Sequence, residues 1–301
     1  MPSREIQWFP GHMAKTRRLI KENLSYVDVV IELLDARIPY SSKNPEIEKL
    51  TVNRPTLFLL NKSSLADDRC TDAWRRKYTK NGNMAISVDC ITGQGISRID
   101  DAIKEILAEK IARDREKGMS RPIRAMILGI PNVGKSTLIN KLCGSKKAAA
   151  EDRPGVTTSK QWVKTDIGFE LLDMPGVLWP KFEDREIGEK LAATGAIKDS
   201  ILIPEEIACS LLKRLVKFYP DLLKERYLLT DEDMPHLTEA DDEDYDEYTE
   251  NELIYELFLK IGKKRGLLIR GGEVNEERCA AMLLDEFRGG KIGKITLDIP
   301  G

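Results

Sequence analysis

The chain has 301 residues, of which 33% are charged and 41% apolar, with a formal net charge of −2. This composition is typical of a globular protein with room for about two domains. It argues against an integral membrane protein, because no apolar run approaches the ~20 residues that span a bilayer. The N-terminal stretch MPSREIQWFPGHMAK lacks the regions of a signal peptide, so we expect a cytoplasmic protein.

Charge is unevenly distributed along the chain. Residues 231–256 hold thirteen Asp and Glu and no Lys or Arg, so the rest of the chain is net positive. We interpret the acidic block as a solvated loop or helix face, and a positive remainder is compatible with a polyanionic partner without showing one. The five cysteines are scattered without a C-x-x-C pair, which predicts reduced thiols rather than disulfides or a zinc site.

The first part of the chain contains short apolar segments that predict strands, at 27–37, 55–62, 84–89 and 123–130. They are apolar throughout rather than alternating, which is typical of buried parallel strands. The intervals can hold crossover helices, for example at 100–118. KQWVKTD and FELLDMPG then predict a hairpin about Ile167 and Gly168. The pattern indicates an α/β fold with a doubly wound, mostly parallel six-stranded sheet.

After about residue 180 the strand pattern gives way to amphipathic helices, predicted at 204–219, 249–266 and 275–287. We therefore expect two domains, 1–180 with the sheet and 181–301 all-α. Apolar stripes predict the helical core, with members Leu211, Leu215, Phe218, Leu253, Leu257 and Ile261. A basic group is the candidate RNA surface, through phosphate contacts rather than base readout, and comprises Lys260, Lys263, Lys264, Arg265 and Arg270.

The strongest chemical motif is GIPNVGKST at 129–137, which satisfies G-x-x-x-x-G-K-[ST] between a predicted strand and a predicted helix. In this phosphate-binding loop (P-loop), backbone N–H groups cradle phosphates at a helix N-terminus. Lys135 is expected to reach the β and γ phosphates, and Ser136 to bind Mg²⁺. The phosphate cradle is predicted to comprise Asn132, Val133, Gly134, Lys135, Ser136 and Thr137.

Two further phosphate-side motifs follow in order. LLDMPG ends a predicted strand with D-x-x-G, which places Asp173 near Mg²⁺ and the Gly176 N–H near the γ phosphate. RPGVTTSKQW lies between the motifs, where Thr157 or Thr158 can close on Mg²⁺. Three ordered motifs are hard to explain by core packing, so they predict a P-loop nucleotide hydrolase.

A base-binding loop is predicted upstream of the P-loop. LLNKSSLAD follows an apolar run like the N-K-x-D loop of GTPases, and DCITGQGI follows the next strand like the second base loop, S-A-x-x-G-x-G. Both loops are displaced together with their strands, which a chance N-K pair does not explain. The chain therefore resembles a circularly permuted GTPase, since joined ends can preserve the spatial order of strands. The predicted guanine-binding residues are Asn61, Lys62, Ser63, Ser64, Asp89 and Cys90.

Several stretches together resemble the ribosome biogenesis GTPase A family: IQWFPGHMAK, LLDARIPYSSKNP, GIPNVGKSTLINKL, RPGVTTSKQWVK and LLDMPGVLWPKFED. The resemblance implies a bacterial, circularly permuted GTPase that assists late assembly of the large ribosomal subunit. It implies GTP or GDP and Mg²⁺ as ligands, and a helical domain that contacts RNA. The expected partners are large-subunit precursors, with their rRNA and ribosomal proteins, and we expect a monomer away from the ribosome and no membrane partner.

The sequence departs from the family pattern at Ser64, where N-K-x-D has an aspartate, and at Met174, where D-T-P-G is usual. Met174 should matter little, because the phosphate-side contacts belong to Asp173 and Gly176. An aspartate accepts hydrogen bonds from guanine N1–H and N2–H₂, and serine cannot copy this bidentate arrangement. We therefore expect a weakened guanine preference, and we expect Ser64→Asp to tighten GTP binding.

The position after D-x-x-G is Val177, where Ras-type enzymes place a water-orienting glutamine. The family resemblance offers His12 as the replacement, beside Lys135 and Gly176 in the predicted catalytic set. A histidine near neutral pKa can orient or activate water. His12 can equally be a turn residue beside Pro10 and Gly11. P-loop GTPases that lack this glutamine and carry an asparagine at the position of Asn132 often resemble potassium-activated enzymes, so Asn132 is a candidate K⁺ ligand, and the K⁺ charge would act as an arginine finger does elsewhere.

Three functions remain open at this point. The leading hypothesis is a large-subunit assembly GTPase whose nucleotide state controls its hold on rRNA. The alternative is a catalytically weak, nucleotide-dependent rRNA-binding scaffold, which Ser64 and Val177 favour and the intact P-loop motifs oppose. The third is a GTPase acting on tRNA or at a membrane.

Overall fold

The computed structural model divides the chain into two compact units, Met1–Phe182 with Asp298–Gly301, and Glu183–Leu297. It describes residues 10–80, 82–119, 121–144, 162–166, 168–176, 178, 184–197, 203–237 and 246–301, with backbone only at 10–14 and 247. The last four residues thus belong to the first unit, although the sequence pattern placed them with the helices.

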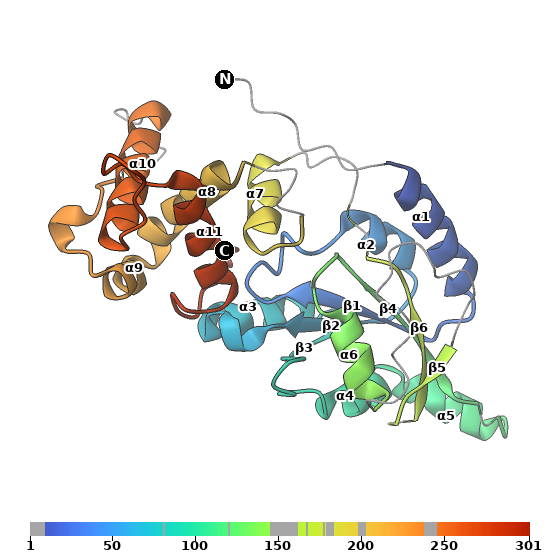
Figure 1. The fold of residues 1–301 in the computed structure, drawn as a ribbon. Coiled ribbons are helices and arrows are strands. Elements are labelled where there is room, and N and C mark those ends of the chain that lie inside the picture. The colour runs from blue at the N-terminus through green and yellow to red at the C-terminus, as the bar shows by residue number, and fades with distance from the viewer. Residues whose placement is uncertain are drawn as a thin grey trace. The chain divides into compact units, whose positions relative to one another are not determined.

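The first unit is built on a six-stranded sheet in the order β3-β2-β1-β4-β6-β5 (Figure 1). Its strands are β1 (Val29–Asp35), β2 (Thr56–Asn61), β3 (Met84–Ser87), β4 (Ile123–Gly129), β5 (Trp162–Lys164) and β6 (Phe169–Asp173). Neighbouring strands are parallel except β5 and β6, which pair antiparallel. The doubly wound, mostly parallel sheet is confirmed.

The register of the sheet determines where the motifs meet. Asp35 at the end of β1 pairs with Asn61 at the end of β2, and Leu33 pairs with Gly129 at the end of β4. Asp173, at the end of β6, pairs with Ile127 of β4. Parallel strands bring their carboxyl ends to one edge, where open α/β sheets bind ligands. The early strands that carry the base loops therefore lie beside the later P-loop strand, as circular permutation requires.

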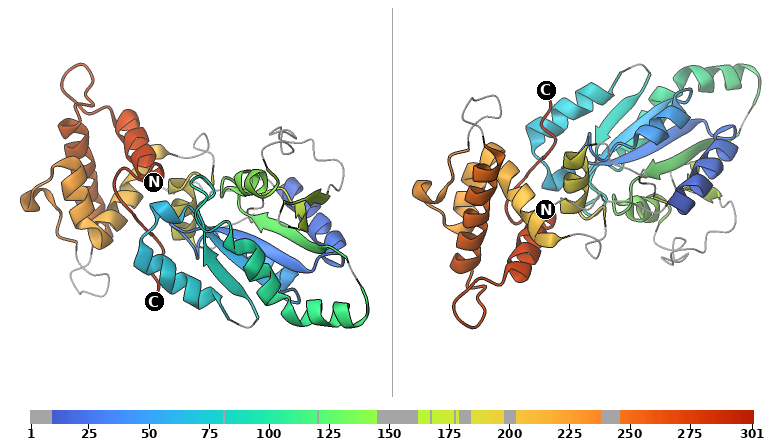
Figure 2. Two further views of the ribbon diagram at one scale, coloured as in Figure 1. Left: turned by 90° about the horizontal axis from the view of Figure 1, so that it is seen from below. Right: turned by 90° about the horizontal axis from the view of Figure 1, so that it is seen from above.

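Helices cover both faces of this sheet (Figure 2). Side chains from β1 and β4 form one apolar cluster with Ile20 of α1 (Pro10–Leu24) and Ile47 of α2 (Pro45–Thr51). On the same face, Trp74 of α3 (Asp68–Tyr78) packs with residues of β1, β2 and β3. The opposite face receives α4 (Arg98–Ile106), which packs on β2 and β3, and α6 (Lys135–Leu142), which packs on β4.

The interval 100–118 is largely helical, as expected, but the helix is broken once. The segment forms two helices, α4 and then α5 (Ala108–Glu116), separated by Leu107 with φ −99° and ψ 11°. Leu107 is buried, whereas α5 has no buried residue. The apolar periodicity extends only over the half that packs on the sheet, so it did not indicate the break.

The C-terminal residues are held in the first unit by Asp298. Its carboxylate accepts hydrogen bonds from Ser41 N at 2.7 Å and Ser41 Oγ at 2.8 Å. Its carbonyl accepts a third from Trp74 Nε1 at 2.7 Å. All three residues are buried, so their polar groups cannot hydrogen-bond to water. These bonds give them protein partners instead.

The second unit is helical, with α7 (Arg185–Ala193), α8 (Pro204–Phe218), α9 (Pro220–Tyr227), α10 (Glu247–Lys264) and α11 (Glu276–Arg288). A short 3₁₀ turn spans Asp231–Asp233. Of the predicted core stripe, Leu211, Leu215, Leu257 and Ile261 are buried. Leu253 is half-buried, and Phe218 was wrongly assigned because, at the last position of α8, it is 42% exposed. Among the described residues, no helix has the length and apolar character needed to cross a membrane.

Candidate nucleotide-binding site

The P-loop connects β4 to α6 through two residues with left-handed backbone. Asn132 has φ 57° and Gly134 has φ 104°. The first intrahelical hydrogen bond of α6 runs from Leu138 N to Gly134 O at 2.9 Å. The N–H groups of Lys135, Ser136 and Thr137 therefore lie in the first turn, where no earlier helical carbonyl can accept from them. This curled backbone before a helix N-terminus has the form of a phosphate cradle.

Lys135 occupies the centre of this loop. Its Nζ donates to Gly129 O at 3.1 Å and Ile130 O at 2.9 Å. Burial lowers the pKa of Lys135 to about 8, although the carboxylate of Asp173 opposes the shift. Burial likewise raises the pKa of Asp173, and Lys135 opposes that change. Lys135, at the start of α6, and Asp173, at the end of β6, are therefore opposite charges that each favour the charged form of the other.

The D-x-x-G segment packs directly against the P-loop. A Cβ at Gly176 would lie 3.0 Å from Pro131 N and 3.0 Å from Lys135 Nζ. A larger residue would have to displace Pro131 or Lys135, so glycine suits this close approach, and the Gly176 backbone lies beside the lysine predicted to reach the γ phosphate. Met174 is buried in the cluster with Leu172 and Ile20. The methionine therefore contributes to the core.

Asn61 joins three loops. Its Nδ2 donates to Val133 O in the P-loop at 2.7 Å, and its Oδ1 accepts from Cys90 N in the second base loop at 3.0 Å. The side chain is 2% exposed. A Cβ at Gly134 would lie 2.4 Å from Asn61 Nδ2, so glycine is also needed for this approach. The two loops predicted to bind the base and the loop predicted to bind phosphate are thus one connected structure.

Lys62 adds a second connection between the loops. With φ 60°, it directs Nζ to Asp35 Oδ2 at 2.9 Å and to Asn132 O at 3.0 Å. Arg37 donates to the same carboxylate through Nε at 2.9 Å and Nη2 at 2.7 Å. Burial would raise the pKa of Asp35, but Arg37 and Lys62 outweigh it and hold that pKa well below its ordinary value.

Sequence reasoning did not assign Asp35 and Arg37 to the site. The available signal was LLDAR, an acidic and a basic residue directly after a buried strand. Arg37 is 1% exposed, and a fully buried arginine needs a charge partner. The pair anchors Lys62, and through it the P-loop.

The remaining base-loop residues form a compact turn. Ser64 Oγ donates to Asp89 Oδ2, while Asp89 Oδ1 accepts from Ile91 N at 2.8 Å and Thr92 N at 2.9 Å. Ser63 donates its N–H to Val88 O at 3.2 Å. Burial, with Asp89 nearby, raises the pKa of the Cys90 thiol to about 12, so Cys90 is a neutral packing residue.

Some predicted site residues lie outside the described part of the chain: Thr157, Thr158 and Val177. His12 lies in the first turn of α1, and its side chain is likewise not described. Of the predicted Mg²⁺ ligands, Ser136 and Asp173 are described. A single hydroxyl and a single carboxylate suit Mg²⁺, which keeps waters and binds substrate phosphates. The described residues contain no cluster of three or more His, Cys, Asp or Glu arranged to bind a metal.

The predicted RNA surface in the second unit is partly neutralised within the unit. Asp233 pairs with Lys260 at 3.1 Å and with Lys264 at 2.9 Å. Arg265 lies 3.6 Å from Glu286. These three cations are less available to phosphate than the sequence indicated, and part of the acidic block is a structural partner of the basic group.

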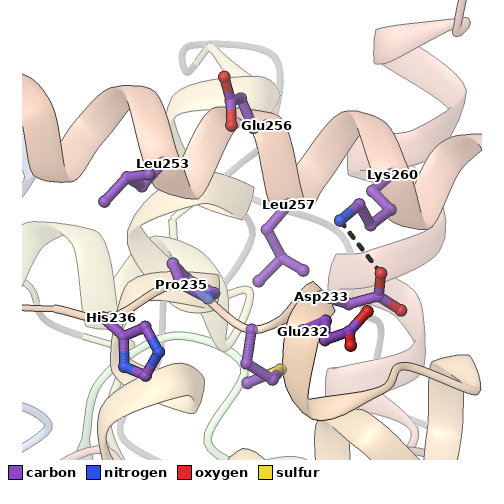
Figure 3. A pocket seen from close by; sticks show the side chains of 9 residues that line it. Glu232, Asp233, Pro235, His236, Leu253, Glu256, Leu257 and Lys260 are labelled. Carbon is purple, nitrogen blue, oxygen red and sulfur yellow. Dashed lines mark ion pairs between the residues drawn. The ribbon is translucent and has the colours of Figure 1, made fainter.

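A cavity of about 310 Å³ lies beside the Lys260–Asp233 ion pair (Figure 3). It is lined by Glu232, Asp233, Met234, Pro235, His236, Leu253, Glu256, Leu257 and Lys260. His236 is exposed at its rim. The lining carries none of the phosphate or base motifs, so we assign it no nucleotide.

Comparison with known proteins gives consistent matches. A family model described as 50S ribosome-binding GTPase matches residues 124–230. Ribosome biogenesis GTPase A of Bacillus cereus is 49% identical over 296 residues, covering 98% of this chain and 94% of that protein. The protein of the same name from Priestia megaterium is 49% identical, covering 98% and 97%.

Solved structures support the same fold. GDP-bound YlqF has a TM-score of 0.60 at 24% identity, covering 94% of this chain and 99% of that one. GNP-bound YlqF from T. maritima has a TM-score of 0.59 at 24% identity, covering 94% and 97%.

Proposed function

The chain belongs to the ribosome biogenesis GTPase A family, and from this membership we propose that it binds large-subunit precursors and promotes their late maturation. In this proposal the subunit stimulates hydrolysis of GTP to GDP and phosphate. The observation that carries the nucleotide part is Asn61, which joins the P-loop to both base loops. The names of the relatives and the 50S ribosome-binding family match support the ribosomal part.

On the phosphate side, Lys135 and the N–H groups of the first turn of α6 would bind the β and γ oxygens. The ammonium group now donates to two P-loop carbonyls, so binding exchanges these bonds for charge-assisted bonds to phosphate. Ser136 and Asp173 would hold Mg²⁺, with Thr157 or Thr158 completing the set. Mg²⁺ supplies neutralisation of the developing phosphate charge.

The attacking water requires another group, because Val177 has no polar atom. We assign this role to His12, which the bound subunit would hold at the γ phosphate. Orientation or proton transfer of this kind contributes about 10²- to 10⁴-fold in rate. K⁺ at Asn132 is the competing source of catalytic charge.

The helical unit, corresponding to the expected domain 181–301, would contact rRNA with the protein acting as a cytoplasmic monomer away from the ribosome. Its contacts would be to phosphate. Lys263 and Arg270 are the stronger candidates, since Lys260, Lys264 and Arg265 pair internally.

Single-turnover phosphate release on saturating large subunits tests the proposal. His12→Ala should remove most of the stimulation while GTP affinity stays within about threefold, a change under ~0.7 kcal/mol. His236→Ala, which changes the exposed histidine of the second unit, is the matched control. Absence of stimulation in the unmodified protein would contradict the GTPase proposal and favour the rRNA-binding scaffold.

The same assay in K⁺ and Na⁺ separates the two catalytic groups. Stimulation that survives in His12→Ala but disappears in Na⁺ would transfer the role to the Asn132 cation. Sedimentation of lysate with a non-hydrolysable GTP analogue tests the partner, and cosedimentation with tRNA or membranes instead of large subunits would overturn it.

A further inference from the structure

The residue that replaces the expected guanine-binding aspartate is in contact with a carboxylate from the other base loop. Ser64 Oγ donates to Asp89 Oδ2. The two residues are 25 positions apart and follow different strands, β2 and β3. The site therefore still contains a carboxylate, that of Asp89, and the Ser64 hydroxyl is hydrogen-bonded to it.

The direction of this hydrogen bond follows from chemistry. An ionised carboxylate only accepts hydrogen bonds, whereas a serine hydroxyl has one donor and two acceptor lone pairs. Burial works to raise the pKa of Asp89, but hydrogen bonds from Ser64 and from the backbone of Thr92 and Ile91 outweigh it and keep that pKa below its ordinary value. The Ser64 hydroxyl proton is therefore donated to Asp89, and toward any other partner Ser64 Oγ can only accept a hydrogen bond.

Asp89 itself is poorly placed to receive the base. It is 3% exposed, whereas Ser64 is half-buried. Its carboxylate has about four acceptor positions. These are engaged by Ser64, by the N–H groups of Ile91 and Thr92, and by the Thr92 hydroxyl. The outer group available to a base is the Ser64 oxygen.

We propose that Asp89 is a positioning residue for base selectivity, which makes Ser64 an obligate hydrogen-bond acceptor for a guanine N–H donor. Guanine presents N1–H and N2–H₂ on this edge, whereas adenine presents the acceptor N1, which an acceptor-only oxygen repels. The inference rests on the proposed GTPase function and assigns Asp89 a role that acts through Ser64.

Asp89→Asn tests whether the direction of the Ser64–Asp89 hydrogen bond sets base selectivity, with almost no change in the shape of the side chain. The amide oxygen would take the position that accepts from Ile91 N and Thr92 N, so the NH₂ group would face Ser64 and donate to it. The Ser64 proton would then point outward, which disfavours guanine and favours adenine. We expect the ratio of ADP to GDP dissociation constants to fall by about tenfold or more, which corresponds to ~1.4 kcal/mol.

Two further variants distinguish a reversed hydrogen bond at Ser64 from a general disruption of the base loops. In Ser64→Asp with Asp89→Asn, the amide donates to a carboxylate that again only accepts, so guanine preference should return. Ser64→Ala removes the acceptor, so it should weaken GDP binding, and it also removes the repulsion of adenine N1, so ADP binding should be tighter or unchanged. Circular dichroism melting confirms that each variant is folded before titration.

An unchanged ADP to GDP ratio in both Asp89→Asn and Ser64→Ala would overturn the inference while leaving the GTPase assignment intact. Loss of preference in Asp89→Asn without recovery in the double variant would also overturn it, because the effect would be structural. If the unmodified protein did not discriminate GDP from ADP, the proposed GTPase function itself would fail.

Discussion

Asn61 Nδ2 and the carbonyl of Val133, 72 residues apart in the chain, are joined by a 2.7 Å hydrogen bond. The other end of the same amide accepts from Cys90 N at 3.0 Å. Because Asn61 is buried, both bonds are shielded from water, and the three loops hold one another in place. The nucleotide loops are therefore organised by a protein side chain before any ligand contact is considered.

Asn61→Ala should weaken GDP binding by roughly 10- to 100-fold. The change leaves a buried carbonyl and a buried N–H unpaired, at about 1–3 kcal/mol each, and frees the loops to separate. Fluorescent-GDP titration measures the effect. Asn140→Ala, on the exposed face of α6, is the control, and equal affinities for the two variants would contradict the role of Asn61.

Nucleotide binding should take up a proton through Lys135. Its pKa is lowered to about 8, so near that pH part of the population is neutral, and phosphate binding restores the charge. We expect uptake of roughly half a proton at about pH 8 and almost none at about pH 6.5. Calorimetry in buffers with different ionisation enthalpies measures this uptake.

Lys135→Arg provides the reference, because a guanidinium group stays protonated throughout. Any proton uptake that it retains comes from the nucleotide phosphates and is subtracted. Identical uptake by the arginine variant and the unmodified protein would show that Lys135 is fully charged before binding.

Ser64→Asp by itself should not tighten GDP binding, contrary to the expectation from the motif alone. The new carboxylate would lie against Asp89, and two like charges in contact force one to bind a proton or separate. Ser64→Asp with Asp89→Ser exchanges the pair and removes the repulsion. We expect the exchanged pair to bind GDP more tightly than the single variant, by at least about tenfold, as measured by isothermal titration at neutral pH.

Glu32 should make the first unit less stable as the pH rises. This carboxyl group lies within β1, is 1% exposed, and its Oε1 has no hydrogen-bond partner among the described residues. Burial raises the pKa of Glu32 from 4.5 to about 8, although Lys43 opposes the shift. Between these values the folded state holds a proton that the unfolded chain releases, so the contribution present below 4.5 is lost as pH rises through about 8.

Glu32→Gln should reduce the fall in the free energy of unfolding with pH. The reduction should be up to about 1.4 kcal/mol per pH unit between pH 4.5 and about 8. Denaturant unfolding at several pH values from about 4.5 to 8 measures the slope. Glu105→Gln changes an exposed carboxyl group of α4 and should retain the slope. A slope that persists unchanged in Glu32→Gln would place the titrating group elsewhere.

Local sequence was sufficient to predict the buried strands, the P-loop and the permuted order of the motifs. Mostly apolar runs predicted β1 to β4, because strands buried on both faces are apolar at most positions; Glu32 is a buried exception within β1. The spacing of Lys135 and Ser136 after the glycines predicted the P-loop, since that loop is built almost entirely from consecutive backbone groups. The order of the motifs indicated circular permutation, because each base loop kept its own strand beside it.

Only the tertiary structure decided the contacts between loops. Asn61 reaches Val133, Lys62 reaches Asp35, and Ser64 reaches Asp89 because parallel strands align their carboxyl ends. The sequence marked Ser64 as a missing carboxylate, since a motif records what stands at one position and not what lies beside it. Polarity at a binding site depends on which neighbour takes the hydroxyl proton, and that neighbour is set by strand register rather than by chain spacing.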